Sequence, residues 1–143
     1  MYGNLYLVST PIGNLEDLTF RAVKILSSVD IILAESVERT KKLLSHYDID
    51  AKVVSFNKDN EKRKTKDVIA HLQNSKNIAL VSDAGTPSIS DPGFYLLSNI
   101  DEKVKIIPIP GVSSITCALS VSKIPMNGFC LLYTSDAADD ASS

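Results

Sequence analysis

The sequence is short of the side chains that bind metals and of the long apolar runs that cross membranes. It contains two cysteines and two histidines. Cys117 and Cys130 do not have the CxxC or Cys/His spacing of a zinc site, so we expect no metal. No apolar run is long enough to span a bilayer, and no basic-then-apolar leader is present. We therefore expect a cytoplasmic protein with no membrane partner.

The chain also has little excess charge of either sign. Fifteen Lys and Arg face seventeen Asp and Glu, for a net charge of −2, so the overall balance does not indicate nucleic-acid binding. A basic cluster at 58–66 is interleaved with acidic residues, which favours a solvated helix face. The length of 143 residues and the hydrophobic fraction of 44% are typical of one globular domain with its own core.

Five short apolar runs predict five strands, separated by segments with helical spacing of apolar residues. This alternation predicts an α/β fold, a mostly parallel five-stranded sheet with helices on both faces. Pro108 in the last run indicates an edge strand. Cys117 lies in an apolar helical segment at 115–121 and is expected to be a small core residue. The five runs are 5–8, 30–34, 51–56, 77–81 and 104–109.

Three loops rich in glycine, proline, serine and threonine follow predicted strands, at 9–14, 82–93 and 110–114. With right-handed crossovers, all three rise at the same edge of the sheet. Small side chains and prolines leave a backbone that is rigid and approachable, which predicts a small-molecule or cofactor site made largely of main chain. None of the loops is a GxGxxG fingerprint or a Walker A loop, so no dinucleotide or nucleoside triphosphate is indicated.

The longest loop leads into a predicted helix. Ser90 or Asp91 is expected to cap this helix, with Pro92 at its first position.

Two acidic residues, Glu35 and Asp83, each stand at the end of a predicted strand. Both are candidates for a catalytic carboxylate that accepts a proton. Asp83 is equally well suited to an Asx-type turn within its own loop. Glu35 is equally well suited to an ion pair or a cap at the start of the following helix. These alternatives stay open at the level of the sequence.

Three motifs in a fixed order carry a resemblance to a known family: LVSTPIGNLEDLT at 7–19, ALVSDAGTPSISDPG at 79–93 and PIPGVSS at 108–114. Together they resemble the ribosomal RNA small subunit methyltransferase I family. This family is part of the tetrapyrrole methylase-like superfamily, the class III S-adenosylmethionine-dependent methyltransferases. The resemblance runs from about residue 4 to residue 129. Three matches in the right order are far more specific than one short pattern.

The resemblance implies an N-terminal α/β domain that is followed by a second one, with S-adenosylmethionine bound in the cleft between them. It implies 2′-O-methylation of a cytidine ribose in the decoding region of 16S ribosomal RNA. The small ribosomal subunit is then the partner, and a homodimer is expected for the full-length protein. The cofactor-binding residues that it implies are Pro11, Gly13, Asn14, Asp83, Ala84, Gly85, Thr86, Pro87, Ile89, Gly111, Ser113 and Ser114.

Two segments depart from the family pattern. Ser36, Val37 and Glu38 stand where the family has Asp, Thr and Arg, and a His-rich segment is replaced by the run 57–59. Both segments are candidates for contact with RNA or a partner. The alternatives are therefore a methyltransferase for a tetrapyrrole or other small acceptor, or a non-catalytic α/β binding module. The segment SDAGTP argues against a tetrapyrrole enzyme, where a Gly-Gly-Asp-Pro form is more typical.

The end of the chain departs further from the family. We expect residues 1–123 to form the N-terminal domain and 124–129 to begin the link to a second domain. Residues 130–143, rich in Asp, Ala and Ser, are expected to be a disordered tail that is foreign to the family. On this interpretation the chain is a truncated fragment that is inactive without its second domain.

Overall fold

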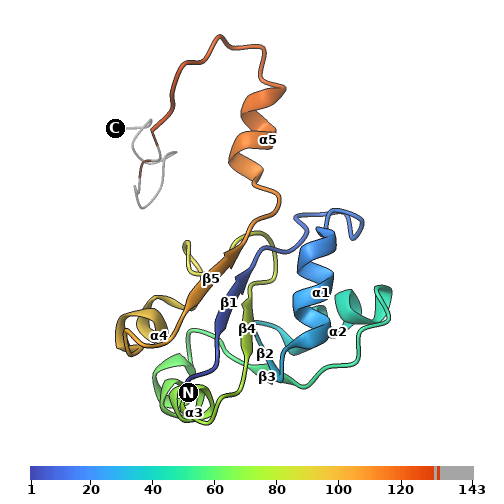
Figure 1. Ribbon diagram of the computed structural model, residues 1–143. Helices are drawn as coiled ribbons and strands as arrows, with labels where there is room; N and C mark the ends of the chain where they lie inside the picture. Colours follow the sequence, from blue (N-terminus) through green and yellow to red (C-terminus); the bar gives the residue numbers. More distant parts are fainter. Residues whose placement is uncertain (131, 133–143) are drawn as a thin grey trace.

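Strands and helices alternate along the chain. The computed structural model describes residues 1–130 and 132, and this part contains five strands and five helices (Figure 1). The strands are β1 (Leu5–Val8), β2 (Ile31–Ala34), β3 (Val53–Ser55), β4 (Ile78–Val81) and β5 (Ile106–Ile109). The helices are α1 (Phe20–Ser28), α2 (Val37–His46), α3 (Glu61–Gln73), α4 (Phe94–Asn99) and α5 (Ser114–Ser120).

The five strands form one parallel sheet in the order β3-β2-β4-β1-β5. Every residue of β2 and of β4 is buried, as is typical of parallel strands covered on both faces. The register places Leu5 opposite Ile78 on one side and opposite Ile106 on the other. The predicted α/β fold with a five-stranded parallel sheet is confirmed.

Pro108 lies in an edge strand, as predicted. The N–H groups of Leu5 and Ser9 donate to the carbonyls of Lys105 and Ile109. Alternate residues of β5 therefore bond to β1, and Pro108 turns toward the open edge of the sheet. Because proline has no N–H, no ladder hydrogen bond is lost there, and the edge is a poor template for a further strand.

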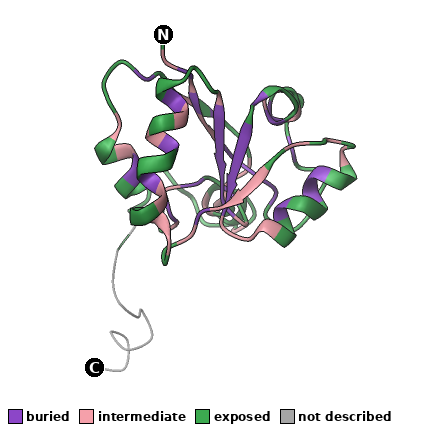
Figure 2. Ribbon diagram, turned by 90° about the horizontal axis from the view of Figure 1, so that it is seen from below, coloured by how far each residue is buried: buried purple, intermediate pink, exposed green. Residues whose placement is uncertain are grey.

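Helices cover both faces of the sheet (Figure 2). On one face, Ala22 and Leu26 of α1 pack with Leu43 and Leu44 of α2. On the other, Val68 and Leu72 of α3 pack with Leu96 of α4 around the fully buried ring of Phe56. Alternate strand residues serve the two faces, since Ile32 belongs to the first cluster while Ile31 and Leu33 belong to the second.

The predicted cap of α4 is wrong. The capping position is Gly93, and the helix begins at Phe94, so neither Ser90 nor Asp91 caps it and Pro92 precedes the helix. The first amides of α4 are instead bonded by a side chain of another helix, Glu61.

The predicted burial of Cys117 is also wrong, because this side chain is exposed. α5 has no buried residue, and it extends from the end of β5 away from the sheet (Figure 1). Within residues 1–130, no helix combines the length and the apolar character needed to cross a membrane.

Candidate functional site

The three predicted loops meet at the carboxyl ends of the adjacent strands β4, β1 and β5. Thr10 and Gly85 exchange two backbone hydrogen bonds of 3.0 Å each. The hydroxyls of Ser9 and Thr86 lie 2.8 Å apart, within hydrogen-bonding distance. A Cβ on Gly111 would lie 2.7 Å from the Cβ of Ser9, so glycine is required where the third loop passes the first. The topology therefore brings all three loops together at the carboxyl end of the sheet.

The loop 82–93 uses backbone conformations that most side chains avoid. Positive φ angles occur at Gly85, Ser88, Ser90 and Gly93, with values of 82°, 69°, 61° and 138°. Its beginning is held by Ser82, whose hydroxyl donates to the carbonyls of Ala84 and Gly85 at 3.2 Å each. The loop is thus a tightly specified turn that presents main-chain groups rather than long side chains.

The residues predicted to bind a cofactor fall into three classes of exposure. Pro11, Gly85 and Pro87 are buried, so they shape the loops from beneath. Asp83 and Ser113 are half-buried. The exposed residues are Gly13, Asn14, Ala84, Thr86, Ile89, Gly111 and Ser114. A ligand at the carboxyl end of the sheet therefore meets open backbone, mostly small side chains and the exposed side chain of Ile89.

Four of the predicted residues line one pocket, of about 300 Å³, between the first loop and α2. These are Pro11, Gly13, Asn14 and Asp83. A second hollow, of about 420 Å³, lies between 16–19 and 110–112 and includes Gly111. The linings of these two hollows do not include the exposed loop residues Ala84, Thr86 and Ile89 or the serines at the start of α5.

The two candidate carboxylates lie together because β2 and β4 are neighbours. Asp83 Oδ1 accepts a 3.1 Å hydrogen bond from the backbone N–H of Ser36, directly after Glu35. The pKa of Glu35 is raised first by burial and then by the charge of Asp83 and a hydrogen bond to its carboxyl. Asp83 thus ties the end of β4 to the end of β2.

Two further charged residues belong to this site, and the sequence did not single them out. Burial raises the pKa of Asp91. The positive charge of Lys58 lowers this pKa in part, and the negative charge of Asp83 raises it further. Arg39 lines the pocket, with its Nη1 3.9 Å from Asp83 Oδ2. The sequence pattern indicates Asp91 only as a helix cap. The strand order, which brings β2 beside β4, places Arg39 at the start of α2 close to Asp83.

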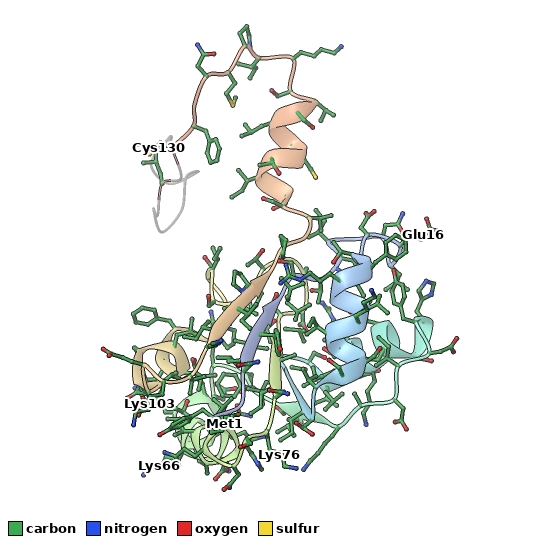
Figure 3. The ribbon with its side chains drawn as sticks, in the orientation of Figure 1. Met1, Glu16, Lys66, Lys76, Lys103 and Cys130 are labelled. Atoms are coloured by element: carbon green, nitrogen blue, oxygen red, sulfur yellow. The ribbon has the colours of Figure 1, made fainter. Side chains whose placement is uncertain are left out.

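The charge of the site suits a cationic ligand. The negative charge of Asp83 raises the pKa of Glu35 and of Asp91, and a cation bound near these carboxyls relieves the repulsion. In the described part of the chain, no group of His, Cys, Asp and Glu residues is arranged to hold a metal ion. Met1, Lys76 and Lys103 lie at the opposite end of the sheet from Glu16, which follows the first loop (Figure 3).

Comparison with known proteins finds a family match over most of the chain. Residues 4–140 match the family described as tetrapyrrole (corrin/porphyrin) methylases. This match extends past residue 129, where we expected the resemblance to end. Residues 131 and 133–143 of the predicted tail lie outside the described residues.

Two curated relatives are both named ribosomal RNA small subunit methyltransferase I. The chain is 51% identical over 129 residues to the protein of Buchnera aphidicola subsp. Baizongia pistaciae, covering 90% of the chain and 44% of that relative. It is 51% identical over 128 residues to the protein of Halalkalibacterium halodurans, covering 89% and 44%. The chain therefore spans less than half the length of these relatives.

A solved structure shows the same fold. The uroporphyrin-III-C-methyltransferase from Thermus thermophilus aligns with a TM-score of 0.62 at 23% identity, over 87% of this chain and 55% of that one. At this identity the likeness concerns the fold alone. Because the family match covers nearly the whole sequence, the chain belongs to the tetrapyrrole (corrin/porphyrin) methylase family, as a relative of ribosomal RNA small subunit methyltransferase I.

Proposed function

We propose that this chain supplies one wall of the S-adenosylmethionine cleft of a methyltransferase for 16S ribosomal RNA. The reaction is 2′-O-methylation of a cytidine ribose in the small ribosomal subunit. The observation that carries the proposal is the 51% identity to relatives named for this RNA. A tetrapyrrole acceptor is less well supported, because the uroporphyrin enzyme is only 23% identical. A cytoplasmic location and a full-length homodimer accompany the proposal and stay predictions.

The residues at the sheet edge fit this cofactor in shape and charge. Exposed Gly13, Ala84 and Thr86 leave the backbone open to its polar groups. When bound, S-adenosylmethionine supplies a methyl group on a positively charged sulfur. Glu35, Asp83 and Asp91 provide the complementary negative charge.

Glu35 is our candidate for the base that accepts the proton of the ribose hydroxyl. Its raised pKa makes the carboxylate a stronger proton acceptor at neutral pH. Asp83 is more fully engaged, by the Ser36 N–H and Arg39. In this arrangement Asp83 orients and Glu35 accepts the proton. The remaining acceleration comes from positioning the oxygen in line with the methyl carbon.

The test is a methyl-transfer assay with small ribosomal subunits and labelled S-adenosylmethionine. The enzyme is this chain joined to the remaining half of a relative. We expect label in 16S ribosomal RNA, and a loss of at least about a hundredfold with Glu35→Gln. Glu102→Gln, an exposed carboxylate away from the loops, is the control. Transfer to a tetrapyrrole supports the small-acceptor alternative, and a folded fusion without any transfer supports a non-catalytic module.

The chain of 143 residues is expected to bind S-adenosylmethionine weakly or not at all, because it carries one wall of the proposed cleft. Calorimetric titration tests this directly. A micromolar dissociation constant, which corresponds to about −8 kcal/mol, would contradict the prediction that a second wall is needed.

A further inference from the structure

The carboxylate of Glu61, the first residue of α3, bonds the beginning of α4. Its Oε1 atom accepts hydrogen bonds from the backbone N–H groups of Gly93 at 2.9 Å, Tyr95 at 3.2 Å and Leu96 at 3.4 Å. These are amides that a helix leaves without internal partners. α4 has no side-chain cap of its own, so Glu61 takes the place of one.

Gly93 is also the last residue of the loop 82–93. A Cβ at this position would lie 2.9 Å from Leu80 Cδ2 and 3.0 Å from Ser88 Cβ, so the loop folds closely against itself here. Ser88 and Ser90 hold positive φ angles, which persist only where the surroundings enforce them. The beginning of the loop is held by the Thr10–Gly85 pair. Its end is held by Glu61.

Glu61 is itself held by the end of β3. Asn60 Oδ1 accepts from the N–H of Asn57 at 2.8 Å, and Asn60 Nδ2 donates to Ser55 Oγ at 3.1 Å. Lys64 Nζ donates to the carbonyl of Ser55 at 2.6 Å. These bonds fix the first turn of α3 to the end of β3. The carboxylate of Glu61 is therefore held in a defined place.

A second contact joins the same two helices. The ammonium of Lys62 lies 5.8 Å from the centroid of the Tyr95 ring, within the range of a cation–π interaction.

We propose that Glu61 is a positioning residue for the loop 82–93. By accepting hydrogen bonds from Gly93, Tyr95 and Leu96, it holds this strained loop in the conformation that binds the cofactor. The inference rests on the proposed function for its consequence in catalysis. The effect on the order of the loop is independent of that function. A simple helix cap affects only the amides that it bonds, whereas a positioning residue also orders the segment before them.

Hydrogen exchange of the 143-residue chain separates these two roles. With Glu61→Ala we expect exchange across 82–92 to rise by about tenfold or more, while α1 stays as in the unmodified chain. Glu61→Gln keeps an acceptor oxygen of the same reach and should restore most of the protection. Asp67→Ala, at an exposed carboxylate of the same helix, is the matched control and should change nothing. Faster exchange confined to residues 93–96 overturns the proposal.

The consequence for catalysis is measured with the fusion to the remaining half of a relative. Glu61→Ala should raise the KM for S-adenosylmethionine about tenfold with kcat nearly unchanged, as expected for lost cofactor binding. An active Glu61→Ala fusion with an unchanged KM overturns the proposed role. If the unmodified fusion transfers no methyl group, that result counts against the proposed function, and hydrogen exchange alone decides the role of Glu61.

Discussion

At the scale of single residues, the carboxyls at the strand ends lower stability, because their negative charges lie close together. Glu35 and Asp83 come from neighbouring strands, and Asp91 adds a third negative charge nearby. Without a cationic ligand, this repulsion disfavours the charged forms. Arg39 offsets little of it, because its side chain is 73% exposed and its contact with Asp83 is long.

The cost of Glu35 has a defined pH dependence. In the folded protein the pKa of Glu35 is raised above its ordinary value of 4.5. The folded state therefore retains the proton at a pH where the unfolded state has lost it. Stability therefore falls as the pH rises above 4.5. Glu35→Gln should raise the free energy of unfolding at neutral pH, and this gain should disappear below 4.5.

Urea unfolding over a range of pH measures this effect, with Glu102→Gln as the control. A Glu35→Gln gain that is the same at every pH would count against the raised pKa as its cause.

Gly93 is a second position where a single added atom, a Cβ, should change stability. Gly93→Ala adds a Cβ that meets Leu80 and Ser88, at a φ of 138° that side chains rarely adopt. We expect a loss of about 2 kcal/mol or more in the free energy of unfolding. Gly128→Ala, where nothing lies within 4 Å of the added Cβ, should have almost no effect. Equal unfolding curves for the two variants would exclude the close contact at Gly93.

At the scale of elements, the local sequence pattern predicts the strands and the edge strand, but not the contacts between distant elements. The apolar runs located all five strands, and Pro108 indicated the edge. The basic cluster at 58–66 indicated a solvated helix face, and α3 begins within it, at Glu61. The cap of α4 was missed because its acceptor, Glu61, is distant in sequence. The prediction that Cys117 is buried was wrong. α5 has the apolar composition of a packed helix, but none of its residues is buried against the sheet.

Helix capping gives a prediction at this scale. Thr19 Oγ1 accepts from the N–H of Ala22 at 3.0 Å and caps α1. Thr19→Ala should cost about 1 kcal/mol in the free energy of unfolding. Ser113 stands at the same position of α5 without a side-chain cap bond, so Ser113→Ala is the control and should be neutral. A neutral Thr19→Ala in the same urea titration would show that the cap of α1 adds no stability.

At the scale of the whole molecule, the site depends on strand order, which is the part that sequence predicts least. The convergence of three loops follows from parallel strands with crossovers of one hand. The meeting of Glu35 with Asp83 requires β2 beside β4, and nothing local in either strand specifies this neighbour. The loops and the two carboxylates Glu35 and Asp83 could therefore be predicted as candidate site residues, whereas the contact between the two carboxyls could not.

The packing of the sheet predicts where the chain can be shortened. A chain that ends at residue 113 loses α5, which buries no residue, so its free energy of unfolding should stay within about 1 kcal/mol. A chain that ends at residue 103 also loses β5 and the buried Ile109, and should lose more than about 3 kcal/mol. Urea unfolding of the two chains is the measurement. A large loss in the longer chain would show that α5 contributes to the core.

The position of β1 determines the order of events during synthesis. β1 is made before the other four strands of the sheet, yet it lies between β4 and β5, and Leu5 pairs with Ile78 and Ile106. While a ribosome produces the chain, β2 and β3 can pair early, but β1 has no partner until β4 emerges. Such nonlocal pairing is slow and leaves an apolar strand open to wrong partners. We therefore expect the nascent chain to need protection from aggregation until most of the sheet has been translated.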